Sequence, residues 1–217
     1  MRGDRILVER HHRNAAQIIV DKLLTEITCS ERKYIITVGG ESGSGKSEVA
    51  AAIADALKER GVLTAILQQD DYFVYPPKTN DLTRRNDINW VGPKEVRLDL
   101  LDTNLMDIRE GRDKINKPLV IYDEDRIDSE TINFDPVRVV VAEGTYTSML
   151  KNADIRVFID RDFNDTKAHR IKRVRDDSEL DEFVERVLKI EHEIISSHKA
   201  RANFIIKRDY DVEFIKM

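Results

Sequence analysis

The segment that decides the fold reads Tyr34-Ile35-Ile36-Thr37-Val38-Gly39-Gly40-Glu41-Ser42-Gly43-Ser44-Gly45-Lys46-Ser47-Glu48-Val49-Ala50. Residues 40–47 follow the pattern Gly-x-x-x-x-Gly-Lys-Ser, which is typical of a loop that binds phosphate groups. An apolar run rich in β-branched residues precedes this loop, and an Ala-rich helical pattern follows it. A flexible Gly/Ser linker would not end in Gly-Lys-Ser between a strand and a helix. The segment therefore predicts binding of a nucleoside triphosphate.

Each part of this loop has its own chemical task. Glycines let backbone N–H groups turn inward around a polyphosphate, and the positive end of the following helix adds to their field. Lys46 supplies a mobile positive charge for the β- and γ-phosphates, and the Ser47 hydroxyl is placed to bind Mg²⁺. The residues that we expect to contact the nucleotide are Gly40, Glu41, Ser42, Gly43, Ser44, Gly45, Lys46, Ser47 and Glu48.

Length and composition indicate one soluble α/β domain over residues 1–217, with residues 1–30 as an accessory N-terminal helical segment. The net charge of −5 is spread over interspersed acids and bases, which favours small-molecule partners over nucleic acid. Cys29 is the only cysteine, so an intrachain disulfide is excluded and we expect a reducing, cytoplasmic setting. The chain lacks a run of about 18 apolar residues, so we expect no membrane span.

Acidic residues follow two of the predicted strands. The strand at 62–67 ends in Gln68-Gln69-Asp70-Asp71-Tyr72-Phe73, and the strand at 137–142 ends at Glu143. Ligands of open parallel sheets bind beyond the carboxyl ends of the strands, so these acids should lie near the phosphate loop. Carboxylates in such a place bind Mg²⁺ or its water molecules. We therefore expect Asp70 and Glu143 to join Ser47 in a Mg²⁺ site.

The rest of the chain alternates between helical and strand patterns. Helices are predicted at 15–27, 47–60, 94–109 and 181–200, strands at 155–160 and 204–206, and a hairpin at 118–127. Pro76 and Pro77 introduce a polar run, so residues 72–93 are predicted to form a loop on the acceptor side. His11 and His12 are interpreted as a solvated pair, and the tail after residue 206 shows little pattern.

Residues 161–180 form a lid-like basic segment. Arg170 and Arg173 belong to a group of cations that could close over the triphosphate and neutralise the moving phosphoryl group. The same residues could equally form an ordinary charged helix face that is offset by Asp176, Asp177 and Glu179. Both interpretations stay open at this point.

Taken together, residues 34–206 resemble the P-loop kinases that include uridine kinase, phosphoribulokinase and nicotinamide riboside kinase. Residues 69–73 are similar to the family's Gln-Asp-x-Phe-Tyr segment, which implies that Asp70 activates the substrate hydroxyl. Ala142-Glu143-Gly144 is similar to the family's Phe-Glu-Gly, and residues 166–177 occupy the place of its arginine-rich lid. The resemblance implies a three-layer α/β P-loop NTPase fold, with a mostly parallel sheet flanked by helices and a small lid, and ATP and Mg²⁺ as cofactors.

The chain also departs from the family's patterns. Val91 stands where uridine kinases carry an aspartate for the ribose hydroxyls, and the segment 89–93 is closer to the Phe-Gly-Pro pattern of phosphoribulokinases. Only Tyr122 and Asp123 match the family's Tyr-Asp-Phe-x-x-His, and the Glu-Arg-Gly-Arg of the lid is absent. The identity of the acceptor is therefore left open.

The leading hypothesis is an ATP-dependent kinase that moves the γ-phosphoryl group to a hydroxyl of a small molecule, such as a nucleoside or a sugar-like alcohol. The expected catalytic residues are Asp70, Lys46, Arg170 and Arg173. The expected acceptor-binding residues are Asp71, Tyr72, Asp87, Trp90, Tyr122 and Arg126. Two alternatives remain, a nucleotide hydrolase or switch and a nucleotide-binding protein without kinase activity. The sequence leaves open whether the chain forms a homo-oligomer.

Overall fold

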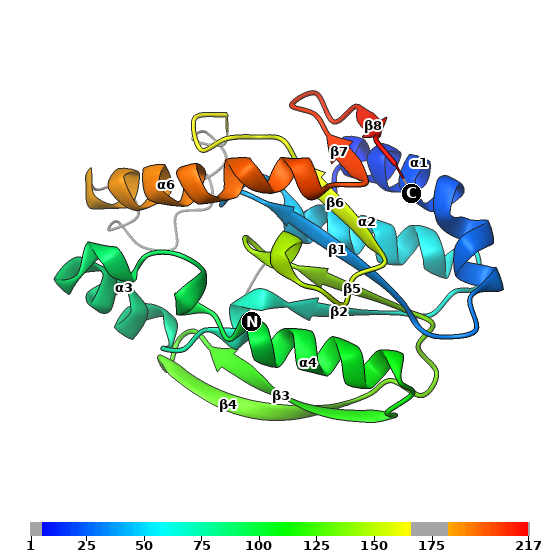
Figure 1. Cartoon of the computed structure of the whole chain (residues 1–217), viewed down its shortest axis with the longest axis horizontal. Coiled ribbons are helices and arrows are strands. Elements are labelled where there is room, and N and C mark those ends of the chain that lie inside the picture. Colours follow the sequence, from blue (N-terminus) through cyan, green and yellow to red (C-terminus); the bar gives the residue numbers. More distant parts are fainter. Residues whose placement is uncertain (1–5, 166–181, 217) are drawn as a thin grey trace.

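A six-stranded sheet with the strand order β2-β5-β1-β6-β7-β8 forms the centre of the computed structural model, which describes residues 6–165 and 182–216 (Figure 1). Its strands are β1 (Tyr34–Gly40), β2 (Thr64–Gln68), β5 (Val139–Glu143), β6 (Ile155–Ile159), β7 (Phe204–Ile206) and β8 (Val212–Phe214). All neighbouring strands are parallel except β8, which pairs antiparallel with β7. The predicted mostly parallel sheet is confirmed, and the carboxyl ends of its parallel strands meet at one edge.

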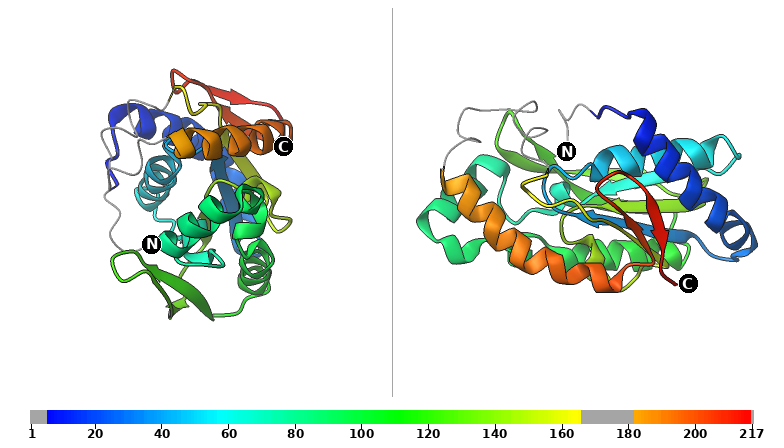
Figure 2. Two further views of the ribbon diagram at one scale, coloured as in Figure 1. Left: turned by 90° about the vertical axis from the view of Figure 1, so that its left-hand side faces the viewer. Right: turned by 90° about the horizontal axis from the view of Figure 1, so that it is seen from above.

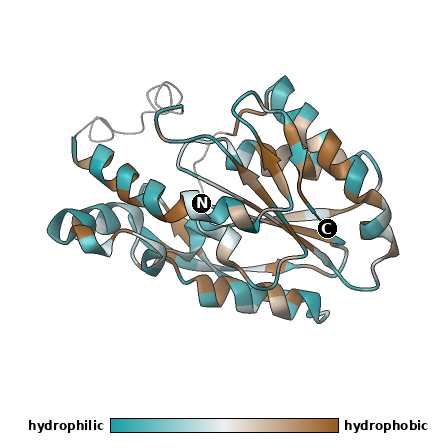
Figure 3. Ribbon diagram, turned by 45° about the horizontal axis from the view of Figure 1, so that its top comes forward, coloured by the Kyte–Doolittle hydropathy of each residue, from teal (hydrophilic) through white to brown (hydrophobic). Residues whose placement is uncertain are grey.

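Helices cover both faces of this sheet. They are α1 (Arg10–Cys29), α2 (Lys46–Lys58), α4 (Leu98–Arg109) and α6 (Glu182–Ile195), with the 3₁₀ helices η1 (Gln69–Tyr72), η4 (Thr147–Met149) and η6 (Ser196–Arg201). Along β1, Ile36 and Val38 pack in a core with α1 and α2, whereas Ile35 packs in a second core with α4 and the end of α6. This alternation follows from the two-residue period of a strand. The predicted three layers are confirmed (Figures 2 and 3).

The described residues 6–165 and 182–216 include no helix with the length and the apolar character that crossing a membrane requires.

The predicted acceptor-side loop contains a helix, which corrects the expectation for residues 72–93. That helix is α3 (Pro77–Asn86), and it is followed by the 3₁₀ turns η2 (Ile88–Trp90) and η3 (Pro93–Glu95). Asn80 is the only buried residue of α3, so the helix shows no apolar stripe in the sequence. The carboxylate of Asp125 accepts hydrogen bonds from the N–H groups of Lys78 and Thr79 and so caps the start of α3.

Asp125 belongs to the turn of a separate antiparallel hairpin. The hairpin joins β3 (Lys114–Ile121) to β4 (Arg126–Asn133), so the predicted hairpin is present with longer strands than expected. In Figure 1 it lies below α4, and α3 extends beyond the carboxyl edge of the main sheet. The cap from Asp125 therefore ties α3 to the hairpin.

The N-terminal helix and the C-terminal segment meet beside the phosphate loop, which corrects two further expectations. His12 is 1% exposed, and its Nε2 lies 3.2 Å from the hydroxyl of Tyr210. His12 is therefore not a solvated residue. The segment after β7 is ordered by β8, and the turn between the two strands brings Tyr210 to α1. A contact across 198 positions leaves no periodic signal in the sequence.

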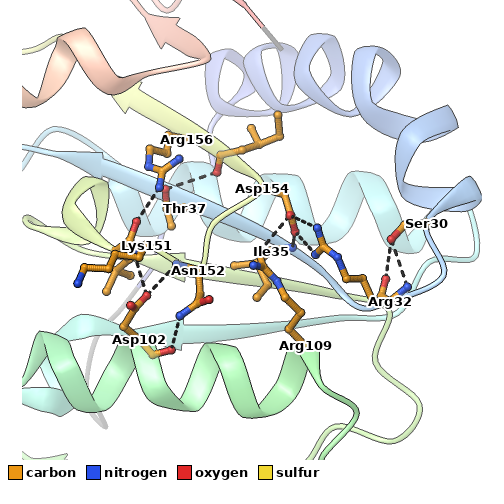
Figure 4. A network of polar contacts seen from close by, with 12 residues as sticks. Ser30, Arg32, Ile35, Thr37, Asp102, Arg109, Lys151, Asn152, Asp154 and Arg156 are labelled. Atoms are coloured by element: carbon orange, nitrogen blue, oxygen red, sulfur yellow. Dashed lines mark hydrogen bonds and ion pairs between the residues drawn. The ribbon is translucent and has the colours of Figure 1, made fainter.

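A polar network at the amino ends of the strands holds the opposite edge of the sheet (Figure 4). Asp154, just before β6, accepts hydrogen bonds from the N–H of Ile35 at 2.8 Å, from Arg32 at 2.7 Å and from Arg109 at 3.0 Å. Because Asp154 contacts the start of β1 and the end of α4 together, it fixes the register of β6 beside β1. The candidate site lies at the other edge, where the parallel strands have their carboxyl ends.

Candidate active site

The phosphate loop connects the end of β1 to the start of α2. Gly43 and Gly45 have φ values of 76° and 100°, and Gly45 is the N-cap residue of α2. Glycine is the residue that adopts these left-handed conformations at little cost. A Cβ atom on Gly40 would lie 2.9 Å from Ser44 Oγ and 3.0 Å from the carbonyl oxygen of Ile159. The loop therefore needs its glycines to curl over the N-terminus of α2, where unpaired N–H groups favour an anion.

Lys46 and Ser47 open α2 and point to two different partners. Lys46 Nζ donates to the carbonyl oxygen of Glu41 at 2.9 Å, and Ser47 Oγ donates to Glu143 Oε1 at 3.1 Å. The register of β1 and β5 pairs Val38 with Glu143, which brings the tip of β5 beside the loop. A hydroxyl and a carboxylate are the hard oxygen ligands that Mg²⁺ prefers. The residues present therefore fit a Mg²⁺ ion beside bound phosphates.

Glu143 has an unusual electrostatic environment. Its side chain is buried, and burial together with the negative charge of Asp70 raises its pKa to about 7. The positive charge of Lys46 and the hydrogen bond from Ser47 act in the opposite direction. At neutral pH both the protonated and the ionised forms of Glu143 are therefore populated, and a bound cation would favour the ionised form.

Asp70 lies two residues beyond the end of β2, on the turn η1. Gln68 pairs with Glu143 in the register of β2 and β5, so Asp70 and Glu143 share the carboxyl edge of the sheet. Gln69 fixes the turn, because its Oε1 accepts a hydrogen bond from the N–H of Tyr146 at 2.7 Å. A Cβ atom on Gly144 would lie 2.3 Å from Gln69 Cβ, so the close approach requires glycine at this position. Asp70 itself is half-buried, which leaves its carboxylate within reach of a bound molecule.

The neighbours Asp71 and Tyr72, which were predicted to contact the acceptor, are buried in the protein. The Asp71 carboxylate forms a 2.7 Å ion pair with Lys117 and accepts a hydrogen bond from the N–H of Val120 at 3.1 Å. Tyr72 is fully buried, and its hydroxyl accepts a hydrogen bond from Asn104 at 2.9 Å. Both side chains anchor η1 to the hairpin and to α4, so their effect on Asp70 is indirect.

The four other predicted acceptor residues are not gathered in one place. Asp87 is exposed and caps η2 by accepting a hydrogen bond from the N–H of Asn89, and Trp90 Nε1 donates to Asn80 Oδ1. Tyr122 and Arg126 line a 410 Å³ hollow on the hairpin. Arg126 forms its ion pairs there with Glu124 and Asp128.

Within the phosphate loop, Glu41 has a task that the motif does not reveal. Its buried carboxylate accepts a hydrogen bond from the N–H of Phe163 at 2.8 Å and lies 2.6 Å from His192 Nδ1. Burial raises the pKa of Glu41, while the contact with His192 opposes that change. The side chain therefore ties the loop to α6 and to the residues after β6. Arg170 and Arg173 lie outside the described residues.

Sequence reasoning missed a buried charged cluster between α3 and α6. Arg84 of α3 forms ion pairs with Glu95 of η3 and with Glu191 of α6. Glu191 was detectable, because it stands with Val187, Leu188 and Ile195 on the buried stripe of α6. A carboxylate on an apolar stripe needs a partner, and the partner of Glu191 comes from a helix with no apolar pattern.

The model of the Phosphoribulokinase / Uridine kinase family matches residues 35–212. A bifunctional α-galactosidase/sucrose kinase of Mediterraneibacter gnavus is 28% identical over 195 residues, which are 84% of this chain and 21% of that protein. A uridine kinase of Saccharomyces cerevisiae is 31% identical over 147 residues, or 64% of this chain and 28% of that protein. A uridine kinase of Staphylococcus epidermidis is 29% identical and matches 79% of this chain and 86% of its own length.

Solved structures show the same fold. A D-glycerate 3-kinase from Cryptococcus neoformans var. grubii superposes with a TM-score of 0.66 at 13% identity, covering 95% of this chain and 100% of that chain. At this identity the likeness concerns the fold alone. The spans matched in the first two relatives are short parts of longer proteins, so the chain corresponds to 21% and 28% of their lengths.

Proposed function

The chain belongs to the phosphoribulokinase/uridine kinase family, and on this basis we propose that it transfers the γ-phosphoryl group of ATP to a hydroxyl group of a small molecule. The observation that carries the proposal is the meeting of Lys46, Ser47, Asp70 and Glu143 at one edge of the sheet. These residues supply a mobile cation, two oxygen ligands and a carboxylate base, which are the parts that phosphoryl transfer needs.

Phosphate binding is the task of the loop and Lys46. Lys46 lies back on the carbonyl oxygen of Glu41, and we expect its ammonium group to move to the β- and γ-phosphates when ATP binds. Ser47 and Glu143 would hold Mg²⁺, which neutralises charge on the phosphate oxygens when it is bound. Arg170 and Arg173 are proposed to add positive charge around the transferred group.

Asp70 is proposed as the general base. Its carboxylate would accept the proton of the attacking hydroxyl, a role that commonly contributes about 10²–10⁴-fold to a rate. The anchors of η1, which are Gln69, Asp71 and Tyr72, would hold Asp70 in place. Two of the relatives are named for sucrose and for uridine, and both compounds carry hydroxyl groups. This supports a nucleoside or a sugar-like alcohol as the acceptor.

The test is the release of ADP from Mg-ATP in the presence of nucleosides, sugars, sugar phosphates and small polyols. One acceptor should raise turnover by orders of magnitude, and Asp70→Asn should lower that turnover about 10²–10⁴-fold with ATP affinity unchanged. Asp99→Asn, on an exposed position of α4, is the matched control and should behave like the wild type. ADP release that ignores every acceptor would indicate a hydrolase or switch. ATP binding without any turnover would indicate a non-catalytic nucleotide-binding protein.

A further inference from the structure

Of two buried polar groups near the candidate site, one has no hydrogen bond and the other has a single one within the described part of the chain. Tyr146 is 2% exposed, and its hydroxyl has no hydrogen-bond partner among the described residues. Glu191 is 7% exposed, and within the same part of the chain its carboxylate accepts one long hydrogen bond, from Arg84 Nη2 at 3.2 Å. Buried polar groups of native proteins are nearly always paired, so the Tyr146 hydroxyl needs a partner. The second carboxylate oxygen of Glu191 can accept a further hydrogen bond.

Both groups lie on the carboxyl edge of the sheet, close to the phosphate loop. Tyr146 follows β5, and its N–H is bonded to Gln69, the residue before the proposed base. Burial raises the pKa of the Tyr146 hydroxyl, and the charge of Glu191 raises it further, so the hydroxyl keeps its proton. Burial also raises the pKa of Glu191, while the charges of Arg84 and Lys46 lower it. The next residue of α6, His192, lies 2.6 Å from Glu41 of the phosphate loop, so Glu191 is close to that loop.

A comparison with Glu95 separates this arrangement from an ordinary structural ion pair. Glu95 is fully buried and accepts hydrogen bonds from the N–H of Gly92, from Asn80 Nδ2 and from Arg84. Its hydrogen-bonding capacity is used by the segment that contains α3 and η3. Glu95 thus has a structural role, whereas Glu191 and Tyr146 can still form hydrogen bonds with a bound molecule.

We propose that Glu191, Tyr146 and Arg84 bind the acceptor, and that the acceptor is a neutral compound with adjacent hydroxyl groups. This inference rests on the proposed kinase function. A hydroxyl group can donate to the Glu191 carboxylate while a neighbouring hydroxyl accepts from Tyr146 or from Arg84. Sugars, polyols and the ribose of a nucleoside share this chemistry.

The charge of the cluster disfavours an anionic acceptor. Arg84 is already paired with two carboxylates, those of Glu95 and Glu191. Asp70 and Glu143 add negative charge at the same edge. A phosphate or carboxylate group on the acceptor would therefore meet like charges at close range, and the repulsion would weaken its binding.

The test compares acceptors in matched pairs and uses variants that keep the shape of the site. Fructose and fructose 6-phosphate, glycerol and glycerate, and uridine and uridine monophosphate are each assayed for ADP release from Mg-ATP. We expect turnover only with neutral members of the pairs, and the productive pair identifies a sugar, a polyol or a nucleoside. Glu191→Gln and Tyr146→Phe should each lower kcat/KM for that acceptor about 10- to 100-fold, with KM for ATP unchanged. Glu193→Gln on the exposed side of α6, and Tyr34→Phe at the amino end of β1, should leave both constants unchanged.

The outcomes separate this inference from the proposed function. Preference for a phosphorylated or carboxylated acceptor would overturn the inference and leave the kinase function standing. An unchanged kcat/KM for the acceptor in both Glu191→Gln and Tyr146→Phe would also overturn the inference and leave the kinase function standing. Absence of turnover with every acceptor would refute the kinase function, and the inference with it. Thermal unfolding of each variant shows that it is folded, and Tyr146→Phe provides an independent test if Glu191→Gln is unstable.

Discussion

Replacing Lys117 with methionine removes one partner of a buried ion pair that supports the proposed base. The side chains of Lys117 and Asp71 are 3% and 4% exposed and lie 2.7 Å apart. Without Lys117, Asp71 keeps its hydrogen bond from the N–H of Val120 but has lost its positive partner. Removing one partner of a buried ion pair costs about 3–5 kcal/mol. Glu130, which also contacts Lys117, is 35% exposed and can be hydrated, so we expect little further cost from it.

The same substitution should reduce activity without weakening ATP binding. Asp71 and Asp70 are adjacent on η1, so a displaced Asp71 moves the proposed base away from the acceptor. We therefore expect kcat to fall while KM for ATP stays the same, because the phosphate loop is held by other contacts. The double variant Lys117→Met/Asp71→Leu removes both charges. It should recover most of the lost stability but not the hydrogen bond with Val120.

Urea unfolding of the wild type, Lys117→Met, Asp71→Leu and the double variant measures these free energies. Lys114→Met is the matched control, because Lys114 is exposed on the same strand. A loss below about 1 kcal/mol for Lys117→Met would be the behaviour of an exposed ion pair and would refute the reasoning. Wild-type kcat in a destabilised Lys117→Met would show that the pair supports the fold and not the position of Asp70.

Two further predictions concern the tip of β5. The pKa of Glu143 is raised from 4.5 to about 7 in the folded protein. The folded state therefore binds a proton on Glu143 more tightly than the unfolded state does. As the pH rises from 4.5 to 7, the Mg²⁺-free protein should lose up to about 3 kcal/mol of stability. Glu143→Gln should abolish this loss. Urea unfolding at pH 5 and at pH 8 measures the difference in stability between the wild type and the variant, and the same difference at both pH values would contradict the prediction. Gly144→Ala should lower kcat and stability more than Gly111→Ala. Both glycines have a positive φ, but only a methyl group at position 144 would collide with Gln69. Equal effects of the two substitutions on kcat and on the urea midpoint would argue against this packing explanation.

The parts of the site that sequence predicted are those with a local signature. The phosphate loop is a short motif between a strand and a helix, and its glycines, Lys46 and Ser47 occupy the places that the motif implies. Asp70 and Glu143 follow β-strands, and the rule for parallel sheets places both at one edge. In each case the information lies within a few residues of the side chain concerned.

The residues that sequence missed depend on contacts between distant segments. The ion pair of Asp71 with Lys117 depends on the hairpin and has no signal near Asp71 in the sequence. His12 looked solvated because its partner Tyr210 lies in the turn before β8. Glu191 carries a local signal, a charge on the buried stripe of α6, but α3 supplies its partner Arg84.

The sequence by itself determined the family, the mostly parallel sheet flanked by helices, and the phosphate-loop motif, but not α3 or β8. These follow from hydrophobic periodicity and from a motif whose backbone geometry is local. Only the tertiary structure decided that Asp71 is buried against Lys117 while Asp70 is half-buried, and that the buried Tyr146 hydroxyl has no partner among the described residues. Burial and pairing depend on side chains from α3, α6 and the hairpin, which meet only after the chain has folded, and the free energy of a charged group depends on those neighbours.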